Sequence, residues 1–422
     1  MSVLISHPSV APFVQQAAQA IYEANLLDSY HTTFCYEPHK AWQRAAFWAS
    51  RALGRDLEPR FRRRLVTGIP SSLLRSHPFR ELLRLSAGPF DQSGRLGDSV
   101  WEWAELGFDR AVARGVRSSL SAVYGYEHCC EATFSAARAL GLATLYDVPA
   151  PEPQSVEDML DREVEQFPIL DTPFHRHTRS RISRRIARRQ AEWASADVVI
   201  AASTFTRQSF EKAGLATAKV RIVPYGAPPP LPPETALRRQ KAEGKVRLIW
   251  AGTFSVRKGA HYLIDAWRKF SLGRVAELDI YGTNGLPRTL FSPWPDGVTY
   301  HGPIARSELT DNYTRSDALI FPTLCDGFGM VASEAWSCGC PVIMTACAGA
   351  SDFLRPHENG FMIEPRSPDA IAEGVLWCAD NRGTLGSMRE ASLTTAASWQ
   401  WSDYRARLAS IVAEIAGTKT RP

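Results

Sequence analysis

Four charged residues in the C-terminal half have the types and the spacing to bind a negatively charged ligand that also carries hydroxyl groups. Asp326 and Glu334 are separated by seven residues, and Gly-Phe-Gly follows Asp326 directly. Arg257 and Lys258 are adjacent and are followed by Gly259. Two such cations can neutralise two phosphates, and carboxylates accept hydrogen bonds from sugar hydroxyls or from a ribose diol. These residues therefore predict a site for a diphosphate attached to hydroxyl-bearing groups.

Each charged segment follows a predicted strand and runs into a predicted helix. Arg247–Gly252 has the pattern of a buried strand before the basic segment, and Ala318–Thr323 has it before the acidic segment. Ligands of a doubly wound sheet bind outside the carboxyl ends of its strands. Gly327 and Gly329 allow backbone N–H groups to approach a ligand, and the helix N-terminus beyond them adds partial positive charge. We therefore expect both segments to line one pocket.

Each segment alone also has a plainer interpretation. Asp326 could be only a helix cap and Glu334 a solvated helix residue, while Arg257 and Lys258 could belong to a solvated loop. Two such segments at strand ends of one predicted sheet favour the binding site over coincidence.

The pattern of the second half alternates strands and helices, which indicates a parallel sheet with helices on both faces. Further strands are predicted at Glu277–Gly282, Val298–His301 and Pro341–Thr345, and helices at Ala260–Phe270, Arg306–Ser316, Met330–Cys338 and Pro368–Asp380.

The first half is also α/β but less regular, and residues 40–120 are rich in helix patterns with interleaved aromatics and arginines. Strands are predicted at Val3–Ser6, Leu142–Tyr146, Val198–Ala201 and Val220–Val223, and a helix from about Pro12 to Ala24. The proline-rich stretch APPPLPP at 227–233 excludes a helix or a central strand, so we expect a semi-rigid linker at 227–244. The predicted fold class is α/β with two Rossmann-like doubly wound domains, at 1–226 and 245–397.

Length and composition are those of a multidomain globular protein. The chain has 422 residues, of which 45% are hydrophobic and 22% charged, and no stretch is long and apolar enough for a membrane span. The first ten residues have no signal-peptide pattern, and the eight cysteines form no CxxC pair. We expect reduced, buried thiols in a cytoplasmic protein.

The net charge of +5 is modest, but the arginines cluster in the first half, at 60–64 and at 176–189. A helix predicted at 175–193 would place Arg181, Arg184, Arg185 and Arg188 on one face. This face could dock peripherally on an anionic membrane or bind an anionic acceptor, or it could simply be solvated. The sequence has no zinc-finger spacing and no aromatic RNA-binding pattern, so no nucleic-acid partner is expected.

These segments resemble the retaining glycosyltransferases of family 4, also called glycosyl transferases group 1, which have a GT-B fold. The resemblance covers most of the chain and is strongest at about 192–400. It is carried by AEWASADVVIAASTFTRQSF (191–210), KVRIVPYG (219–226), GTFSVRKG (252–259), ALIFPTLCDGFGMVASEAWSCGCPVI (318–343), GASDFL (349–354) and NGF (359–361).

The resemblance implies roles for the charged residues. Lys258, helped by Arg257, would bind the diphosphate of a nucleotide-sugar donor, Glu334 would hold the ribose hydroxyls, and Asp326 would hold the transferred sugar. The other implied donor-binding positions are Gly252, Thr253, Gly282, Pro303, Ile304, Gly327, Phe328, Gly329, Met330 and Val331. The segment from about 398 to 422 resembles a last helix that crosses back to the first domain.

This sequence departs from the family pattern at several positions. Asp326 stands where the family usually has Glu, and Thr253 stands where it usually has Arg. The glycine-rich loop after the first strand is absent, and HPSVAP at 7–12 replaces it. The shorter Asp326 side chain could change the sugar preference.

The family's catalytic-face histidine also has no direct counterpart. Tyr146 or Asp147 stands in its place, and His128 could serve from a neighbouring loop or be an ordinary packed histidine. His7 directly follows the first predicted strand, where a side chain often faces the cleft.

The function that follows is transfer of a hexose-type sugar from a UDP- or GDP-linked donor to a saccharide or a lipid-linked acceptor, in polysaccharide or glycoconjugate biosynthesis. The basic residues and the helix N-terminus would stabilise the departing diphosphate, so no metal or cofactor is required. Retention at the anomeric carbon is implied only by the resemblance.

Two other functions stay open. A nucleotide-sugar epimerase of the same fold shares much of the donor site, whereas a phosphorylase would need a pyridoxal-phosphate lysine motif that the sequence lacks. The departures at Thr253, Asp326 and residues 7–12 are also compatible with an inactive protein that only binds a nucleotide-sugar.

Overall fold

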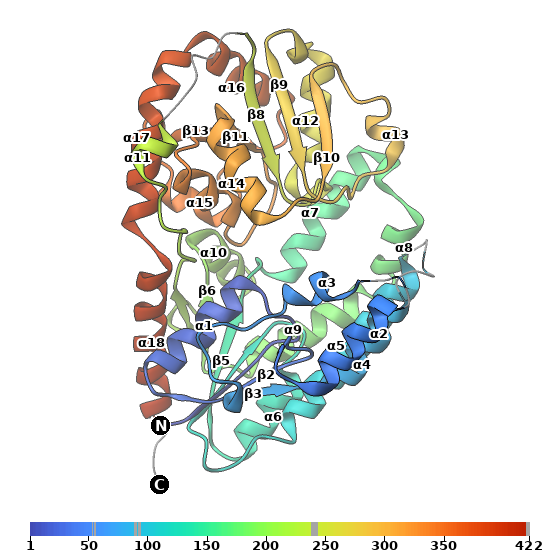
Figure 1. Ribbon diagram of the computed structural model, residues 1–422, viewed down its shortest axis with the longest axis vertical. Coiled ribbons are helices and arrows are strands. Elements are labelled where there is room, and N and C mark those ends of the chain that lie inside the picture. The colour runs from blue at the N-terminus through green and yellow to red at the C-terminus, as the bar shows by residue number, and fades with distance from the viewer. Residues whose placement is uncertain (53, 55, 88–90, 92–93, 238–243, 419–422) are drawn as a thin grey trace.

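The chain forms two parallel β-sheets, one in each half, with helices on their faces (Figure 1). The computed structural model describes residues 1–52, 54, 56–87, 91, 94–237 and 244–418. The N-terminal sheet has seven strands in the order β3-β2-β1-β4-β5-β6-β7, and the C-terminal sheet has six in the order β10-β9-β8-β11-β12-β13. In both sheets the order reverses direction beside the first strand, as in doubly wound folds. The predicted fold class is therefore confirmed.

The strands are short and mostly buried, as expected for parallel strands covered on both faces. Those of the N-terminal sheet are β1 (Val3–Ser6), β2 (Leu27–Thr32), β3 (Leu74–Ser76), β4 (Ala122–Tyr126), β5 (Ala143–Val148), β6 (Val198–Ala201) and β7 (Val220–Ile222). Those of the C-terminal sheet are β8 (Val246–Ala251), β9 (Ala276–Tyr281), β10 (Val298–Gly302), β11 (Ala318–Phe321), β12 (Val342–Met344) and β13 (Gly360–Met362).

Helices connect the strands. Those in the first half are α1 (Pro12–Glu23), α2 (Ala41–Ala52), α3 (Glu58–Arg62), α4 (Pro78–Ala87), α5 (Arg95–Ala113), α6 (Glu131–Ala139), α7 (Pro153–Gln166), α8 (Pro173–Arg179), α9 (Ile182–Ala194) and α10 (Thr204–Lys212). Those in the second half are α11 (Pro233–Ala236), α12 (Ala260–Lys269), α13 (Arg288–Phe291), α14 (Arg306–Arg315), α15 (Met330–Ser337), α16 (Pro368–Asp380), α17 (Arg382–Ser398) and α18 (Trp401–Thr418). Within the described residues no helix is long and apolar enough to cross a bilayer.

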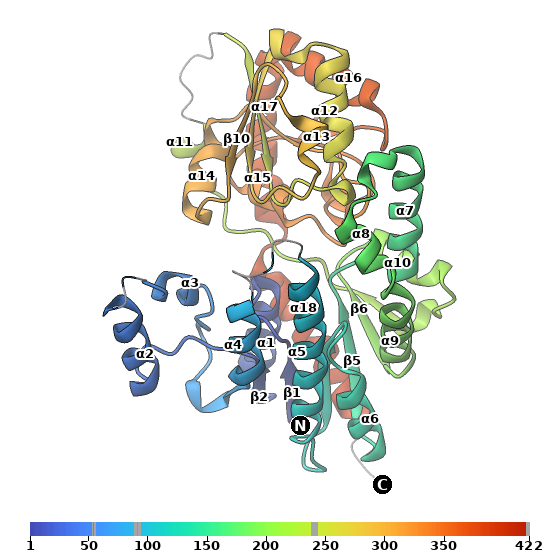
Figure 2. The ribbon, with the colours of Figure 1, turned by 90° about the vertical axis from the view of Figure 1, so that its right-hand side faces the viewer.

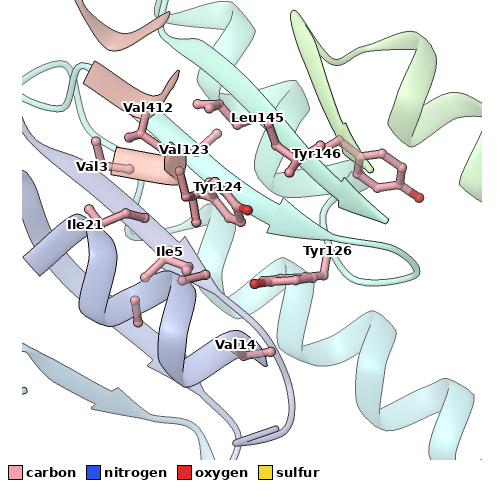
Figure 3. Packing of buried hydrophobic residues seen from close by; sticks show 14 of the residues in the cluster. Val3, Ile5, Val14, Ile21, Val123, Tyr124, Tyr126, Leu145, Tyr146 and Val412 are labelled. Atoms are coloured by element: carbon pink, nitrogen blue, oxygen red, sulfur yellow. The ribbon is translucent and has the colours of Figure 1, made fainter. Parts of the chain in front are cut away.

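The last helix crosses from the C-terminal half to the first domain, as predicted. α18 packs against α1 beside the N-terminal sheet, and Val412 of α18 contributes to the core that contains Val3 and Ile21 (Figures 1 and 3). The crossing chain is held where the two halves meet, because the Trp399 indole Nε1 donates a 2.8 Å hydrogen bond to the Pro224 carbonyl. Residues 419–422 of the predicted helix lie outside the described residues, as do residues 238–243 of the predicted linker.

One helix of the first half packs on the other domain. α7 follows β5 but lies against the C-terminal lobe (Figures 1 and 2), where Met159 belongs to the core of the C-terminal sheet. The buried Glu163 carboxylate accepts hydrogen bonds from Arg366 Nε at 2.6 Å, from the Tyr262 hydroxyl at 2.8 Å and from His261 Nε2 at 3.0 Å. The segment therefore ties the two lobes together.

The single helix predicted at 175–193 is wrong, because the structure has two helices, α8 and α9, that break at Ser180 and Arg181. The Ser180 hydroxyl donates to the His177 carbonyl at 2.7 Å, a local bond that competes with helical hydrogen bonding. Arg181 beyond the break pairs with Glu102 of α5, which shows that tertiary pairing accompanies the change of direction.

Candidate donor site

The basic and acidic segments meet at the carboxyl edge of the C-terminal sheet. Lys258 lies in the turn after β8, and its Nζ forms an ion pair with the Asp326 carboxylate in the loop after β11. The Arg257 carbonyl accepts hydrogen bonds from the amides of Leu324 at 2.9 Å and Cys325 at 3.2 Å. The two turns are thus joined through backbone as well as side chains, as their positions at neighbouring strand ends predicted.

Gly259 makes this close approach sterically feasible. Its φ is +74°, in the left-handed region, and a Cβ there would lie 2.0 Å from the Pro322 carbonyl oxygen. Because any larger residue would push the basic turn away from β11, the glycine that follows Lys258 sets the distance between the two charged turns.

Lys258 is a partly desolvated cation between a carboxylate and an aromatic ring. Burial lowers the pKa of Lys258, and the neighbouring Arg257 guanidinium acts in the same direction. The Asp326 carboxylate opposes both, because a nearby negative charge favours the ammonium form. The Lys258 Nζ also lies 5.1 Å from the centroid of the Phe321 ring. An anion that entered the site would meet this cation with little competing water.

Glu334 lies one turn into α15 and faces a cavity of about 350 Å³ beside the start of the linker. Its Oε1 accepts a 2.7 Å hydrogen bond from Arg306 Nη2, and Pro228 lines the same cavity. Burial raises the pKa of Glu334, while the Arg306 guanidinium opposes that rise. Arg306 could not be singled out from the sequence, because only the fold brings α14 alongside α15.

The remaining predicted donor-binding residues line the same edge of the sheet. Gly252 and Thr253 are exposed after β8, Gly282 follows β9, and Pro303 and Ile304 follow β10. The loops after β8 and β9 are in tight contact, since a Cβ at Gly282 would lie 2.0 Å from the Gly252 carbonyl oxygen.

The glycine-rich turn at 327–329 leads into α15 and also contacts the first domain. Gly329, with φ of +85°, is the N-cap of α15, and Met330 and Val331 form its first turn. The Phe328 side chain packs edge-on against Tyr225 of the first domain, with ring centroids 5.5 Å apart, and edge-on against Phe353 of its own domain at 6.3 Å. Phe328 therefore helps to anchor the turn to the first domain.

His128 lies on the N-terminal domain, in the loop after β4. Its backbone has φ of +73°, and its ring packs edge-on against Trp101 at 5.3 Å. Burial, followed by Arg189, Arg185 and Arg188, lowers the pKa of His128 to about 2, so its imidazole is neutral. Its ring contacts lie in the first domain.

Tyr146 and Asp147, the two residues expected at the position of a catalytic-face histidine, are both buried in the N-terminal sheet. The Tyr146 hydroxyl donates to Glu192 Oε2 at 3.1 Å, and Asp147 accepts a 2.6 Å hydrogen bond from the Tyr124 hydroxyl. Burial raises the pKa of Asp147 to about 7. Their polar groups are thus engaged within the first domain.

Sequence reasoning missed two residues of the N-terminal edge. Trp101 and Glu105 of α5 are shared by two adjoining cavities of about 350 and 230 Å³, which His128 and His7 also line, one each. Glu105 forms no ion pair within the part of the chain that the structure describes, and burial raises its pKa to about 8. The only signal in the sequence is that Trp101 and Glu105 lie about one helical turn apart. This spacing is too common to indicate a binding site.

The arginine cluster at 176–189 is neutralised inside the protein. Every one of its arginines lies within 3.8 Å of a carboxylate, so much of the positive charge of α8 and α9 is paired within the protein. The pairs are Arg176–Asp171, Arg179–Asp161, Arg181–Glu102, Arg184–Glu102, Arg185–Asp98, Arg188–Asp109 and Arg189–Glu127.

The domain that carries the charged turns matches a known protein family. Residues 245–381 match the family model described as glycosyl transferases group 1. D-inositol 3-phosphate glycosyltransferase 1 of Catenulispora acidiphila is 31% identical over 126 residues, 30% of each chain. A D-inositol 3-phosphate glycosyltransferase of Xylanimonas cellulosilytica is 27% identical over 227 residues, 48% of this chain and 53% of the relative. The matches thus span about half the length of these relatives or less.

Two solved structures share the whole fold at low sequence identity. The sucrose-phosphate synthase of Thermosynechococcus elongatus superposes with a TM-score of 0.65 and 16% identity, covering 99% of this chain and 100% of the other. The Anabaena protein HepE in complex with UDP-glucose superposes with a TM-score of 0.61 and 15% identity, covering 98% and 100%.

Proposed function

Since the C-terminal domain of this chain is a glycosyl transferases group 1 domain and the whole chain has the GT-B fold, we propose that the protein is a glycosyltransferase that uses a nucleotide-sugar donor. The observation that carries the proposal is the contact of Lys258 with Asp326, which brings a cation for the diphosphate and an acceptor for sugar hydroxyls to one edge of the sheet. The reaction is transfer of a hexose-type sugar with retention at the anomeric carbon.

In the proposed reaction the donor diphosphate competes with Asp326 for Lys258. Once the donor phosphates bind the Lys258 ammonium group, the Asp326 carboxylate becomes available to the hydroxyls of the transferred sugar. The bond between the anomeric carbon and the diphosphate oxygen then breaks, the acceptor oxygen bonds to that carbon, and the acceptor's hydroxyl proton leaves with the nucleoside diphosphate. Lys258, Arg257 and the N-terminus of α15 stabilise the charge that develops on the diphosphate.

Glu334 holds the ribose in this proposal, and the loops after β9 and β10 hold the base. A buried carboxylate that already accepts one hydrogen bond from Arg306 retains acceptor capacity for a diol. HepE was solved with UDP-glucose, so we propose UDP-glucose as the first donor to test, and GDP-linked sugars as the second.

The acceptor, a saccharide or a lipid-linked saccharide, binds across the cleft on the N-terminal domain. Trp101 offers an aromatic surface for a sugar ring, and Glu105 offers a carboxyl for its hydroxyls. The protein would then act in polysaccharide or glycoconjugate biosynthesis.

In this proposal, peripheral contact with an anionic membrane is made by α2 and α4. Trp48 of α2 is 72% exposed and Phe79 of α4 is 73% exposed. α2 contains no acidic residue, and Glu81, the acidic residue of α4, is buried between Arg64 and Arg84. Exposed aromatics beside cations favour the interface of an anionic bilayer.

The products of a single incubation separate the proposal from its alternatives. We expect release of UDP from UDP-glucose, with slow hydrolysis when no acceptor is present and faster release with a membrane or saccharide extract. An epimerase would instead convert the sugar of the donor while it stays attached to UDP, or release UDP with a free epimer. Binding of UDP-glucose without any turnover would leave an inactive binding protein and contradict the proposal.

A further inference from the structure

Three interdomain hydrogen bonds join the N-terminus of α10 to the second domain, and two of them hold the glycine-rich turn of the donor site. The Ser203 hydroxyl donates to the Gly327 carbonyl at 2.7 Å, and the Thr206 hydroxyl donates to the same carbonyl at 3.1 Å. The third bond has the same direction, because the Thr204 amide donates to the Asp352 carboxylate at 2.9 Å. We call these five residues the interdomain clasp.

The clasp begins at the N-terminus of α10, where the sequence ASTFT builds a cap. Ser203 is the N-cap residue, and its hydroxyl oxygen accepts the Thr206 amide at 3.0 Å while its proton goes to Gly327. The Ser203 and Thr206 side chains are both fully buried. Hydrogen bonds shielded from water in this way are stronger than exposed ones and costly to leave unmade.

The backbone leaves no slack around the clasp. A Cβ at Gly327 would lie 2.0 Å from the Pro149 carbonyl oxygen of the first domain. A Cβ at Gly349 would lie 2.3 Å from the Ser203 Cβ and 2.4 Å from the Gly327 carbonyl oxygen. Glycine at position 327 therefore lets the two domains touch backbone to backbone directly beside Asp326, and glycine at position 349 makes room for the Ser203 side chain.

The second domain grips the same turn from behind. Ala350, in the short helix Gly349–Phe353 that also carries Asp352, donates its amide to the Phe328 carbonyl at 2.6 Å. The turn is therefore held on one side by its own domain and on the other by α10 of the first domain. A relative movement of the two domains must break the clasp or carry the turn with it.

We infer that Ser203 and Thr206, on the acceptor domain, are positioning residues for the donor site: by holding the Gly327 carbonyl they orient the backbone that leads to the N-terminus of α15. The inference rests on the proposed function for the identity of the ligand, but the clasp itself does not. Neither hydroxyl touches the donor, so their effect on it passes through the turn.

The test combines a measurement of the turn with a measurement of the reaction. In the variant Ser203→Ala/Thr206→Val, the amides of residues 326–331 should exchange hydrogen about tenfold faster, as expected for two lost buried hydrogen bonds. The KM for UDP-glucose should rise about tenfold as well, with a smaller change in kcat, because the turn must be ordered when the donor binds.

Two controls separate positioning from general damage. Thr206→Ser keeps the hydroxyl and should restore both the exchange rate and the KM, whereas Thr206→Val alone should show an intermediate effect. Thr204→Ala removes the neighbouring hydroxyl but keeps the backbone amide that Asp352 accepts, and it should behave as the unaltered protein.

Unchanged exchange of 326–331 in the double variant would overturn the inference, as would equal loss of protection throughout β8 and β11, which would indicate ordinary destabilisation. If the unaltered protein does not turn over UDP-glucose or any other nucleotide-sugar, the proposed function fails. In that case, faster exchange confined to the turn would still support the clasp, and unchanged exchange would overturn it.

Discussion

The carboxyl edges of the two sheets present their polar groups in different ways. At the C-terminal edge, charge sits on turns next to glycines, and the main partner contact joins Lys258 to Asp326 across two adjacent strand ends. At the N-terminal edge, the cavity is lined by Trp101 and Glu105, which project from α5, and by His128, which follows β4. A site built from backbone turns leaves a local signature in the sequence, whereas a site built from helix faces depends on how the helices pack.

The two edges also differ in how their cations are used. Arg257 and Lys258 belong to one turn, which among the described residues forms one ion pair with a carboxylate, that of Asp326. Around the cavity beside His128, Arg185 and Arg188 are each bound by more than one carboxylate. We therefore expect anion binding at the C-terminal edge and recognition of a neutral hydroxyl-rich group at the N-terminal edge.

The largest expected effect falls on the C-terminal edge. Lys258→Ala removes a desolvated cation that stabilises the leaving diphosphate, and loss of one such group lowers kcat by about 10²–10³-fold. UDP release from UDP-glucose measures it. Lys269→Ala is the matched control, because Lys269 is an exposed lysine of α12 that pairs with Asp369 at 2.9 Å. Equal activity of Lys258→Ala and Lys269→Ala would show that the donor does not bind at this edge.

Glu334→Gln should raise the KM for UDP-glucose about tenfold, since a hydrogen bond to a charged group is lost. Burial raises the pKa of Glu334, so the carboxylate takes up a proton earlier as the pH falls. The KM of the unaltered protein should therefore rise as the pH is lowered through that raised pKa. If the KM of Glu334→Gln rose with falling pH as much as that of the unaltered protein, the role of the Glu334 carboxylate would be contradicted. Glu308→Gln, on the exposed face of α14, serves as the control.

A substitution at the N-terminal edge should weaken binding of the acceptor sugar and leave binding of the donor unchanged. Trp101→Ala should weaken sugar binding about tenfold, the effect of losing one aromatic contact of 1–1.5 kcal/mol, with an unchanged KM for UDP-glucose. Saturation-transfer NMR with D-glucose, D-galactose and D-mannose as probes measures it. Trp103→Ala, on the same helix but exposed against Arg80, is the control.

Glu105 gives the same edge a pH signature. Because burial raises its pKa to about 8, the carboxyl is protonated at neutral pH and ionises as the pH rises through 8. Sugar binding should therefore change between about pH 7 and 9 in the unaltered protein and stay flat in Glu105→Gln. The same pH profile in both proteins would assign the acceptor site elsewhere.

The smallest effect concerns the outer face of the N-terminal domain. Trp48→Ser/Phe79→Ser should reduce cosedimentation with phosphatidylglycerol-containing vesicles about threefold, while leaving hydrolysis of UDP-glucose unchanged, because two aromatics that bury only part of their surface in the interface contribute roughly 0.7 kcal/mol together. Phe174→Ser, at an exposed aromatic of the neutralised α8, should bind as the unaltered protein. No salt-sensitive binding by the unaltered protein would end the membrane proposal.

The sequence predicts the C-terminal domain better than the N-terminal one, for a physical reason. The helix predicted at Pro368–Asp380 has those bounds in the structure, and its Ser367 N-cap and Pro368 are local signals. β2 gave no such signal, because Ser29, His31 and Thr32 are polar and yet buried in that strand. The contact of Lys258 with Asp326 followed from sheet topology, whereas Arg306 and Glu105 acquire their surroundings only from tertiary packing.

The most direct test of the central claim is a crystal structure of the protein with UDP-glucose bound. The account predicts the diphosphate within hydrogen-bonding distance of Lys258 Nζ and the first amides of α15, with the ribose hydroxyls on Glu334 and Asp326 turned from Lys258 to the glucose. A diphosphate bound among the arginines of α9, or a Lys258 that keeps Asp326 as its only partner while the donor lies elsewhere, would contradict it.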